Sequence, residues 1–200
     1  MKSYIFCLSI AVLVGLADAQ AQSDSEKSEV EVGIRRSEMP ESAVTLLSDW
    51  LAEARRIRYY RETDGDQVSY EIKLKRKGKA YSVEFYEDGS LMDIEQLIRF
   101  RDLPHDVQKS LNRYLSQTYD HYRITRLQKQ YSAEDADEDD EEVLEELEEG
   151  DEDDLTIRYE LVVDIRLGNE VGSYELLFDD EGELLQKRKI VRRSLDNILY

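Results

Sequence analysis

The sequence predicts an α+β protein of two tandem units, each an α-helix packed on a three- to four-stranded antiparallel sheet. Three observations predict this fold: a helical apolar pattern that recurs after 64 residues, alternating apolar and polar stretches behind each helix, and glycine-containing turns between those stretches. With 200 residues, of which 40% are hydrophobic, the chain is long enough to bury a core.

Both predicted helices begin directly after a proline, at Pro40 and at Pro104. Proline suits the first turn of a helix because its missing N–H would have no partner there. Apolar residues then recur at spacings of three, four and seven, which places them on one face. In the first helix they are Ala43, Leu47, Trp50, Leu51, Ala54 and Ile57. In the second helix they are Val107, Leu111, Tyr114, Leu115 and Tyr119.

Strands are predicted behind each helix because apolar and polar residues alternate there. Both units share a signature: Tyr-Glu-apolar-x-apolar, then Tyr-x-apolar-x-Phe, with glycine four positions after the phenylalanine and leucine two positions later. It extends from Tyr70 to Leu91 in the first unit and from Tyr159 to Leu184 in the second. Such antiparallel meanders with a helix on one face are typical of α+β layers.

Residues 1–21 have the pattern of a secretory signal peptide. Lys2 precedes an apolar run from Tyr4 to Leu16, and small-x-small cleavage sequences follow at residues 17–21. The run is too short to span a bilayer of about 30 Å comfortably. We therefore expect a periplasmic or secreted protein with no stable membrane insertion after cleavage. Because Cys7 lies in this peptide, we expect the mature chain to contain no cysteine.

The composition and the repeat divide the rest of the chain. Residues 22–38 are polar and are predicted to be a flexible lead-in. The first unit is expected at 39–102, the second at 103–193 with an acidic insertion at 134–154, and a C-terminal tail at 194–200.

The acidic insertion holds 16 of the chain's 46 acidic residues in 21 positions, without lysine or arginine. Mutual repulsion predicts disorder, although Val143, Leu144 and Leu147 have helical spacing and could form a short helix on binding a partner. Three interpretations stay open: a solubilising segment, a weak site for calcium, or attraction of a basic partner. The candidate calcium ligands are Asp137, Glu138, Asp139, Asp140, Glu141, Glu142, Asp151, Glu152, Asp153 and Asp154.

Composition also excludes several function classes. A net charge of -19 argues against nucleic-acid binding, and two histidines with one cysteine leave little for zinc or haem. The sequence has no nucleophile elbow, phosphate-binding glycine loop or HExxH pair. We therefore expect no enzyme and no cofactor apart from weakly bound calcium, with a carboxylate-based hydrolase as the alternative. The basic run at 73–79 is either the solvated face and tip of a hairpin or a docking site for an anionic envelope polymer or for the acidic insertion of another copy.

The repeated strand signature, with its Phe-x-x-x-Gly-x-Leu ending, resembles the PepSY-like, β-lactamase-inhibitor-like domains of secreted bacterial proteins, in tandem. The resemblance covers about Met39 to Val191. It implies an exported binding module, with inhibition of a peptidase or β-lactamase as the precedent and an unidentified partner that is basic or a secreted enzyme. The alternative is a low-affinity calcium-binding envelope protein that uses the acidic insertion.

Overall fold

The computed structural model describes residues 25–134 and 139–191. The predicted signal peptide and the predicted C-terminal tail lie outside the described residues. None of the helices in the described ranges is long and apolar enough to cross a membrane.

The helices and strands are β1 (Ser25–Lys27), β2 (Val30–Ile34), η1 (Arg36–Glu38), α1 (Glu41–Leu46), α2 (Ser48–Glu53), β3 (Arg55–Asp64), β4 (Gln67–Arg76), β5 (Lys79–Tyr86), β6 (Leu91–Leu97), η2 (Phe100–Asp102), α3 (His105–Thr118), β7 (His121–Ala133), α4 (Asp140–Glu149), β8 (Leu155–Leu167), β9 (Glu170–Asp179) and β10 (Leu184–Ile190). The order of elements contains a repeat: α1 and α2 precede the four strands β3–β6, and α3 precedes the four strands β7–β10, with α4 inserted after β7.

All ten strands belong to one sheet, in the order β1-β10-β9-β8-β7-β6-β5-β4-β3-β2. The predicted fold class of two units with separate small sheets is wrong, because β6 pairs with β7 and joins the strands into one β-rich fold. Neighbours are antiparallel except β1, which is parallel to β10. Separate sheets would leave β6 and β7 as edges with unpaired backbone groups, and their pairing satisfies those groups.

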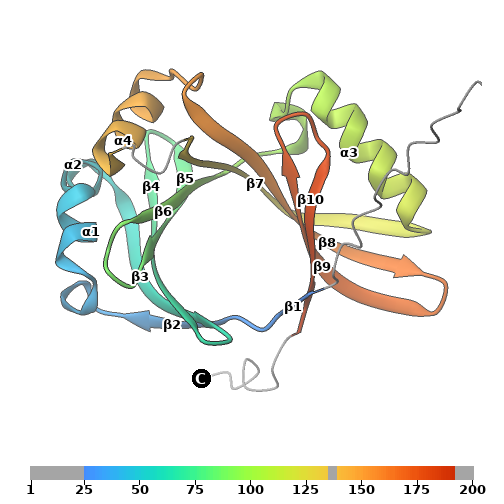
Figure 1. The fold of residues 1–200 in the computed structure, drawn as a ribbon, viewed down its shortest axis with the longest axis horizontal. Coiled ribbons are helices and arrows are strands. Elements are labelled where there is room, and N and C mark those ends of the chain that lie inside the picture. The colour runs from blue at the N-terminus through green and yellow to red at the C-terminus, as the bar shows by residue number, and fades with distance from the viewer. Residues whose placement is uncertain (1–24, 135–138, 192–200) are drawn as a thin grey trace, which may run out of the picture.

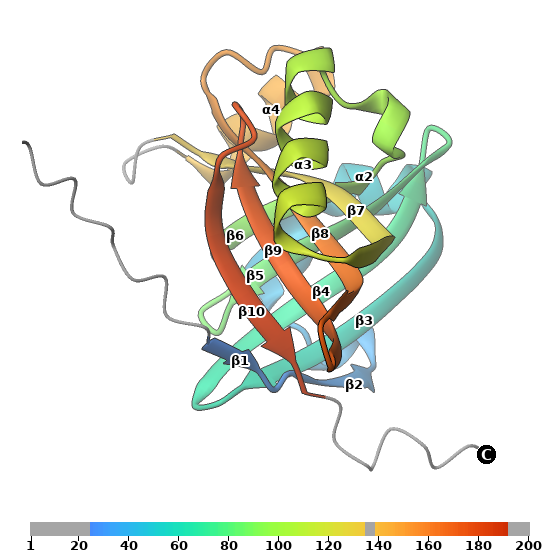
Figure 2. The same ribbon diagram turned by 90° about the vertical axis from the view of Figure 1, so that its right-hand side faces the viewer.

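The sheet curls, and the helices lie on its convex side (Figures 1 and 2). We call this helix-covered side the outer face and the opposite side the inner face. One core cluster packs α1, α2 and α4 against the sheet; its main residues are Leu47, Trp50, Ile72, Phe85, Ile94 and Val143. A second cluster packs α3 against the sheet; its main residues are Leu111, Leu115, Leu161, Leu176 and Phe178.

The two signature glycines hold turns close to the helices. Gly89 and Gly182 have φ angles of 87° and 84°, a region that side chains rarely adopt. A Cβ on Gly89 would lie 2.1 Å from Ser42 Oγ, and one on Gly182 would lie 2.8 Å from Ser110 Cβ. Glycine is therefore required twice over, by conformation and by contact.

The first predicted helix is shorter than its apolar pattern. The chain forms α1 and α2, which meet at Leu47, and Ala54 already has extended backbone with φ -77° and ψ 159°. Ile57 therefore lies in β3. Its spacing suits a helix face as well as a strand, and pairing of β3 with β4 decides the outcome.

The expectation of a flexible lead-in at 22–38 is wrong from Ser25 onward, because β1 and β2 add to the two ends of the sheet. Strand pairing uses backbone hydrogen bonds, so the polar side chains of this segment do not prevent it from joining the sheet. Lys27 accepts a backbone hydrogen bond from Val191 at 3.0 Å, and the Ser28 N–H donates to Asp64 at 3.2 Å. The segment thus links β10 to β3 and closes the ring of Figure 1.

The expectation of a disordered acidic insertion is wrong for Asp140–Glu149, which form α4 between β7 and β8. Asp139 caps the helix by accepting from the Glu141 N–H at 3.2 Å, and acidic residues in the first turn suit the positive end of the helix dipole. Val143 and Leu144 are 1% and 6% exposed in the first core cluster. Burial of these two side chains offsets the repulsion between the carboxylates.

Candidate functional site

The inner face of the sheet carries charged and amide side chains. Strand alternation turns these residues away from the helices, since their neighbours Ile72, Val83 and Ile94 are in the core. The inner-face residues are Glu71, Lys73, Ser82, Glu84, Asp93, Glu95, Gln128, Gln130, Glu160 and Glu175. A cavity of about 260 Å³ lies against this face and is lined in part by Glu84, Glu95, Gln130, Glu160 and Glu175.

Lysine and arginine neutralise some of these carboxylates. Lys27 Nζ lies 2.5 Å from Glu175, and Lys73 Nζ lies 2.8 Å from Glu71. Burial lowers the pKa of Lys27, but Glu175 and other carboxylates outweigh it and raise that pKa above its usual value. The β1 segment therefore brings a firmly protonated lysine to the inner face.

Other inner-face carboxyls are protonated at higher pH than usual. Burial, with Glu160 nearby, raises the pKa of Asp93 to about 7. Burial and Glu175 raise the pKa of Glu160 to about 7. Burial also raises the pKa of Glu84 and of Glu95 well above the usual range. No ion pair joins Glu84, Asp93 or Glu160 to a cation among the residues of the described ranges.

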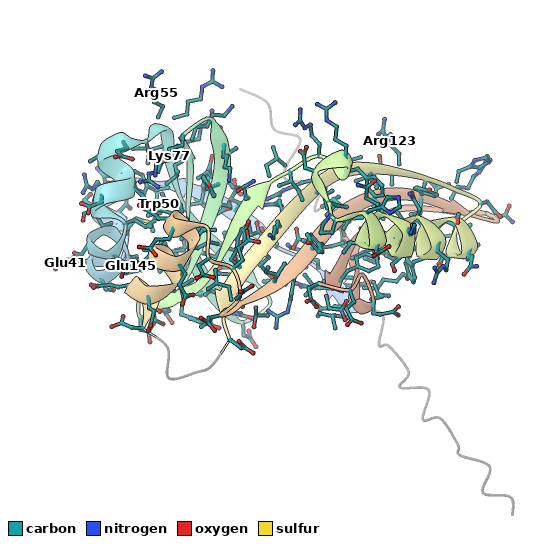
Figure 3. All side chains as sticks on the ribbon, turned by 90° about the horizontal axis from the view of Figure 1, so that it is seen from above. Glu41, Trp50, Arg55, Lys77, Arg123 and Glu145 are labelled. Atoms are coloured by element: carbon teal, nitrogen blue, oxygen red, sulfur yellow. The ribbon has the colours of Figure 1, made fainter. Side chains whose placement is uncertain are left out.

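A second polar feature, which we call the basic groove, runs along the ends of β3, β4, β5, β6 and β7. It consists of two adjoining pockets of about 320 and 800 Å³ that share Lys75, Ala80, Leu97 and Arg126. Its cationic residues are Arg56, Arg58, Lys73, Lys75, Lys79, Arg99 and Arg126. Asp102 is the acidic residue in its lining, and Figure 3 shows nearby Arg55 and Lys77 projecting from the same side of the molecule.

A bulge positions the β3 arginines of the basic groove. The register shifts between Arg55 and Arg58, and Arg56 has a φ angle of 57°, which is uncommon for a residue with a side chain. Backbone strain of this kind costs about 1–3 kcal/mol and is more frequent at functional sites than elsewhere. The bulge therefore marks this end of β3 as a functional candidate.

Four of the groove cations have no ionic partner. Arg56, Arg58, Lys75 and Lys79 form no ion pair with any residue that the structure describes. The others do: Lys73 pairs with Glu31 and Glu71, Arg99 with Asp102, and Arg126 lies 3.7 Å from Glu95. The groove therefore retains an excess of positive charge.

The sequence indicated only part of this groove. The basic run at 73–79 supplies Lys73, Lys75 and Lys79. Arg56, Arg58, Arg99 and Arg126 are remote in sequence, and the sheet brings them beside that run. The sequence signal for these residues is the repeated arginine at 55, 56 and 58. The apolar spacing through Ile57 instead predicts that this stretch ends the first helix.

The predicted calcium ligands of the acidic insertion are dispersed, and Asp137 and Glu138 lie outside the described residues. Asp139 caps α4, and Asp140 accepts from the Leu91 N–H at 2.9 Å. Glu152 lies 2.5 Å from Lys129 Nζ, and Asp151 accepts from the Asp153 N–H. The remaining members are exposed: Glu141, Glu142, Asp153 and Asp154.

Carboxylates that come together closely enough for a cation lie elsewhere in the described part of the chain. They are Glu29 with Glu31 and Glu62, and Glu84 with Asp93 and Glu95. Calcium binding by the acidic insertion stays a prediction.

The comparisons with known proteins show a fold. No family model and no curated protein matches the chain. A candidate periplasmic protein from Bacteroides eggerthii aligns with a TM-score of 0.50 at 12% identity, over 76% of this chain and 88% of that one. A DUF2874 family protein from Bacteroides ovatus gives 0.49 at 13% identity, over 76% and 87%. A BLIP-like protein from Bacteroides fragilis gives 0.47 at 14% identity, over 78% and 89%.

At these identities the similarity concerns the fold alone. The chain shares its fold with the Bacteroides eggerthii protein. A BLIP-like protein is among the similar structures, and the PepSY-like resemblance in tandem units stays a prediction.

Proposed function

We propose that this protein is an exported, non-enzymatic binding module that holds an acidic segment of a partner protein in the basic groove. The observation that carries the proposal is the groove itself, with seven cationic side chains, of which four have no ionic partner among the residues that the structure describes. Cations without partners gain most from a ligand that supplies carboxylates.

A protein partner fits the groove better than a small anion. The lining combines the cations with Leu97, which is 52% exposed, and with Phe100 and Ile98. Leu97 is exposed, and Ile98 and Phe100 are partly buried. Arginine beside accessible apolar and aromatic side chains is typical of protein interfaces. At about 800 Å³ the larger pocket also exceeds the needs of a single carboxylate.

The protein's own acidic helix does not fill the groove. Glu145 of α4 and Glu41 of α1 lie on the helix-covered side, away from Arg55 and Lys77 (Figure 3). Arg76, which is 7% exposed, bridges Glu53 of α2 and Glu148 of α4 at 2.8 Å each. The α4 helix is therefore tied to the outer face, and the groove stays available to a partner.

Export is part of the proposal and is supported by the signal-peptide pattern at 1–21 and by the description of the Bacteroides eggerthii protein as a candidate periplasmic protein. Inhibition of a secreted enzyme, the precedent from the family resemblance, would follow if the acidic segment belonged to such an enzyme.

A labelled oligoglutamate peptide tests the groove by fluorescence anisotropy at low and high salt. We expect R58E/K75E to weaken binding by about tenfold or more, because two cations without partners are reversed. The matched control K109E/R113E reverses two exposed cations on α3 and should bind as the unchanged protein does. Equal affinity of R58E/K75E and the control would refute the proposal.

A further inference from the structure

Three carboxyls face one another across adjacent strands of the inner face. The strand register places Glu71 opposite Glu84 and Glu84 opposite Asp93. Glu95 lies two residues after Asp93, on the same face of β6. Like charges directly opposite each other destabilise a sheet, so this row of acids requires a compensating interaction.

The spacing of the acids suits a cation. One carboxylate oxygen each from Glu84, Asp93 and Glu95 lies within 4.8 Å of the others. Calcium binds oxygens at about 2.3–2.6 Å, so ligands on opposite sides of one ion are about 4.6–5.2 Å apart. The three oxygens therefore fit around a single calcium ion.

Two buried oxygens at this place lack a donor within the described ranges of the chain. Asp93 is 8% exposed, and its Oδ1 has no hydrogen-bond partner, whereas its Oδ2 accepts from Gln130 at 2.9 Å. Gln128 is 3% exposed, its Nε2 donates to Glu95, and its Oε1 has no partner. Buried oxygens without partners are costly and rare.

We propose that Glu84, Asp93 and Glu95 bind one divalent cation, preferentially calcium, on the inner face, and that the side-chain oxygen of Gln128 contributes to the same site. The site is distinct from the basic groove in its ligands, although Gln128 lines both. It is also distinct from the acidic insertion, whose described carboxylates belong to neither close group of acids.

The donor set selects among metals. It consists of carboxylate and amide oxygens, which suit calcium and magnesium and do not suit zinc or copper. His105 and His121, the two histidines of the chain, are exposed at the starts of α3 and β7. Magnesium demands a near-ideal octahedron, whereas calcium tolerates the irregular geometry of side chains from three neighbouring antiparallel strands.

Protein cations cannot take the place of the ion. Lys27 is held by Glu175 at 2.5 Å, and Arg126 lies 3.7 Å from Glu95. Glu84 and Asp93 form no ion pair with any described residue. Glu84 is partly exposed and lines the cavity of about 260 Å³, which gives an ion a route from solvent.

Metal and protons compete for this cluster. Burial raises the pKa of Asp93 to about 7 and those of Glu84 and Glu95 well above the usual range, so the metal-free cluster holds protons near neutral pH. Other charged groups that act on the cluster are Glu71 on β4, Glu160 and Arg158 on β8, Arg126 on β7 and Lys27 on β1.

Titration calorimetry with calcium chloride, in the purified protein and in two variants, tests the site. We expect one calcium per chain with Kd of about 10⁻⁶–10⁻⁴ M. The variant E84Q/E95Q keeps the side-chain shapes and should bind about tenfold or more weakly. The matched control D153N/D154N removes two exposed carboxylates of the acidic insertion and should bind normally.

Thermal unfolding provides the second readout. Calcium should raise the Tm of the unchanged protein and of D153N/D154N, and should leave the Tm of E84Q/E95Q unchanged. If E84Q/E95Q does not fold, the single variant E84Q, whose side chain is only partly buried, replaces it in both measurements. Normal calcium binding by E84Q/E95Q, its loss in D153N/D154N, or the absence of binding by the unchanged protein would each overturn the proposal.

Discussion

The outer and inner faces of the sheet use the same strands for different purposes. On β5, Val83 and Phe85 are fully buried against the helix side, whereas Ser82 and Glu84 turn to the inner face. The outer face is a closed hydrophobic core, and the inner face is a set of partly neutralised acids around a cavity. The difference indicates that stability depends mainly on one face, which leaves the other free to bind ligands.

Removal of a large outer-face side chain should produce the largest effect. Phe178 is 0% exposed and packs edge-on against Tyr114 of α3, with ring centroids 5.4 Å apart. We expect F178A to lower the free energy of unfolding by about 3–5 kcal/mol in urea titrations, because it leaves a cavity. The inner-face variant E84Q should cost less than about 1 kcal/mol, because the amide has nearly the volume of the protonated carboxyl that it replaces. A larger loss in E84Q than in F178A would contradict the division between the faces.

The acidic helix α4 also belongs to the outer face, and a second prediction tests this. Leu144 is 6% exposed among the residues of the first core cluster. L144A should lower the free energy of unfolding by about 2–3 kcal/mol, measured in the same way. If L144A leaves the free energy of unfolding unchanged, α4 does not contribute to the hydrophobic core of the outer face.

Sequence patterns anticipated the local elements better than their assembly. Alternation placed strands around Ile72, Phe85, Leu161 and Phe178, because one buried face imposes a period of two. It could not show that β6 pairs with β7, because backbone ladders leave little trace in side-chain composition.

The same limit applies to the functional candidates. Polar residues such as Glu71 and Glu84 alternate as solvent-facing residues do, and only the curl of the sheet gathers them on one inner face. Arg56 and Arg126 likewise meet the basic run at 73–79 through topology. Charge density was misleading at 25–34 and at 140–149. Backbone pairing outweighs polar composition in the first range, and two buried apolar residues do so in the second.

The third prediction concerns the pH dependence of stability, which should come from protonated carboxyls on the inner face. The pKa values of Asp93 and Glu160 are raised to about 7 in the folded state, above the usual values of about 4. Between about pH 4 and about pH 7 the folded state therefore binds more protons than the unfolded state. The free energy of unfolding consequently falls as the pH rises from about 4 to about 7. Without calcium, urea titrations at pH 5 and pH 8 should differ by on the order of 1–3 kcal/mol from these two groups.

The variant D93N/E160Q isolates this contribution. It removes both titrating carboxyls, so its stability should change less between pH 5 and pH 8 than that of the unchanged protein. An identical pH dependence in both proteins would show that the inner-face acids do not hold the protons assigned to them.

The smallest expected effect comes from the exposed end of the acidic insertion. Asp153 and Asp154 are exposed, and D153N/D154N should change the free energy of unfolding by less than about 0.5 kcal/mol.

The insertion should still take up calcium loosely, in the millimolar range, because its carboxylates lack the fixed geometry of a sensor loop. This uptake should decline with added sodium chloride, since screening over about 8–10 Å acts on exposed charges, whereas the buried inner-face site should keep its affinity. Calorimetry at low and high salt separates the two, and salt-independent uptake that vanishes in D153N/D154N would place the ordered site in the insertion instead of on the inner face.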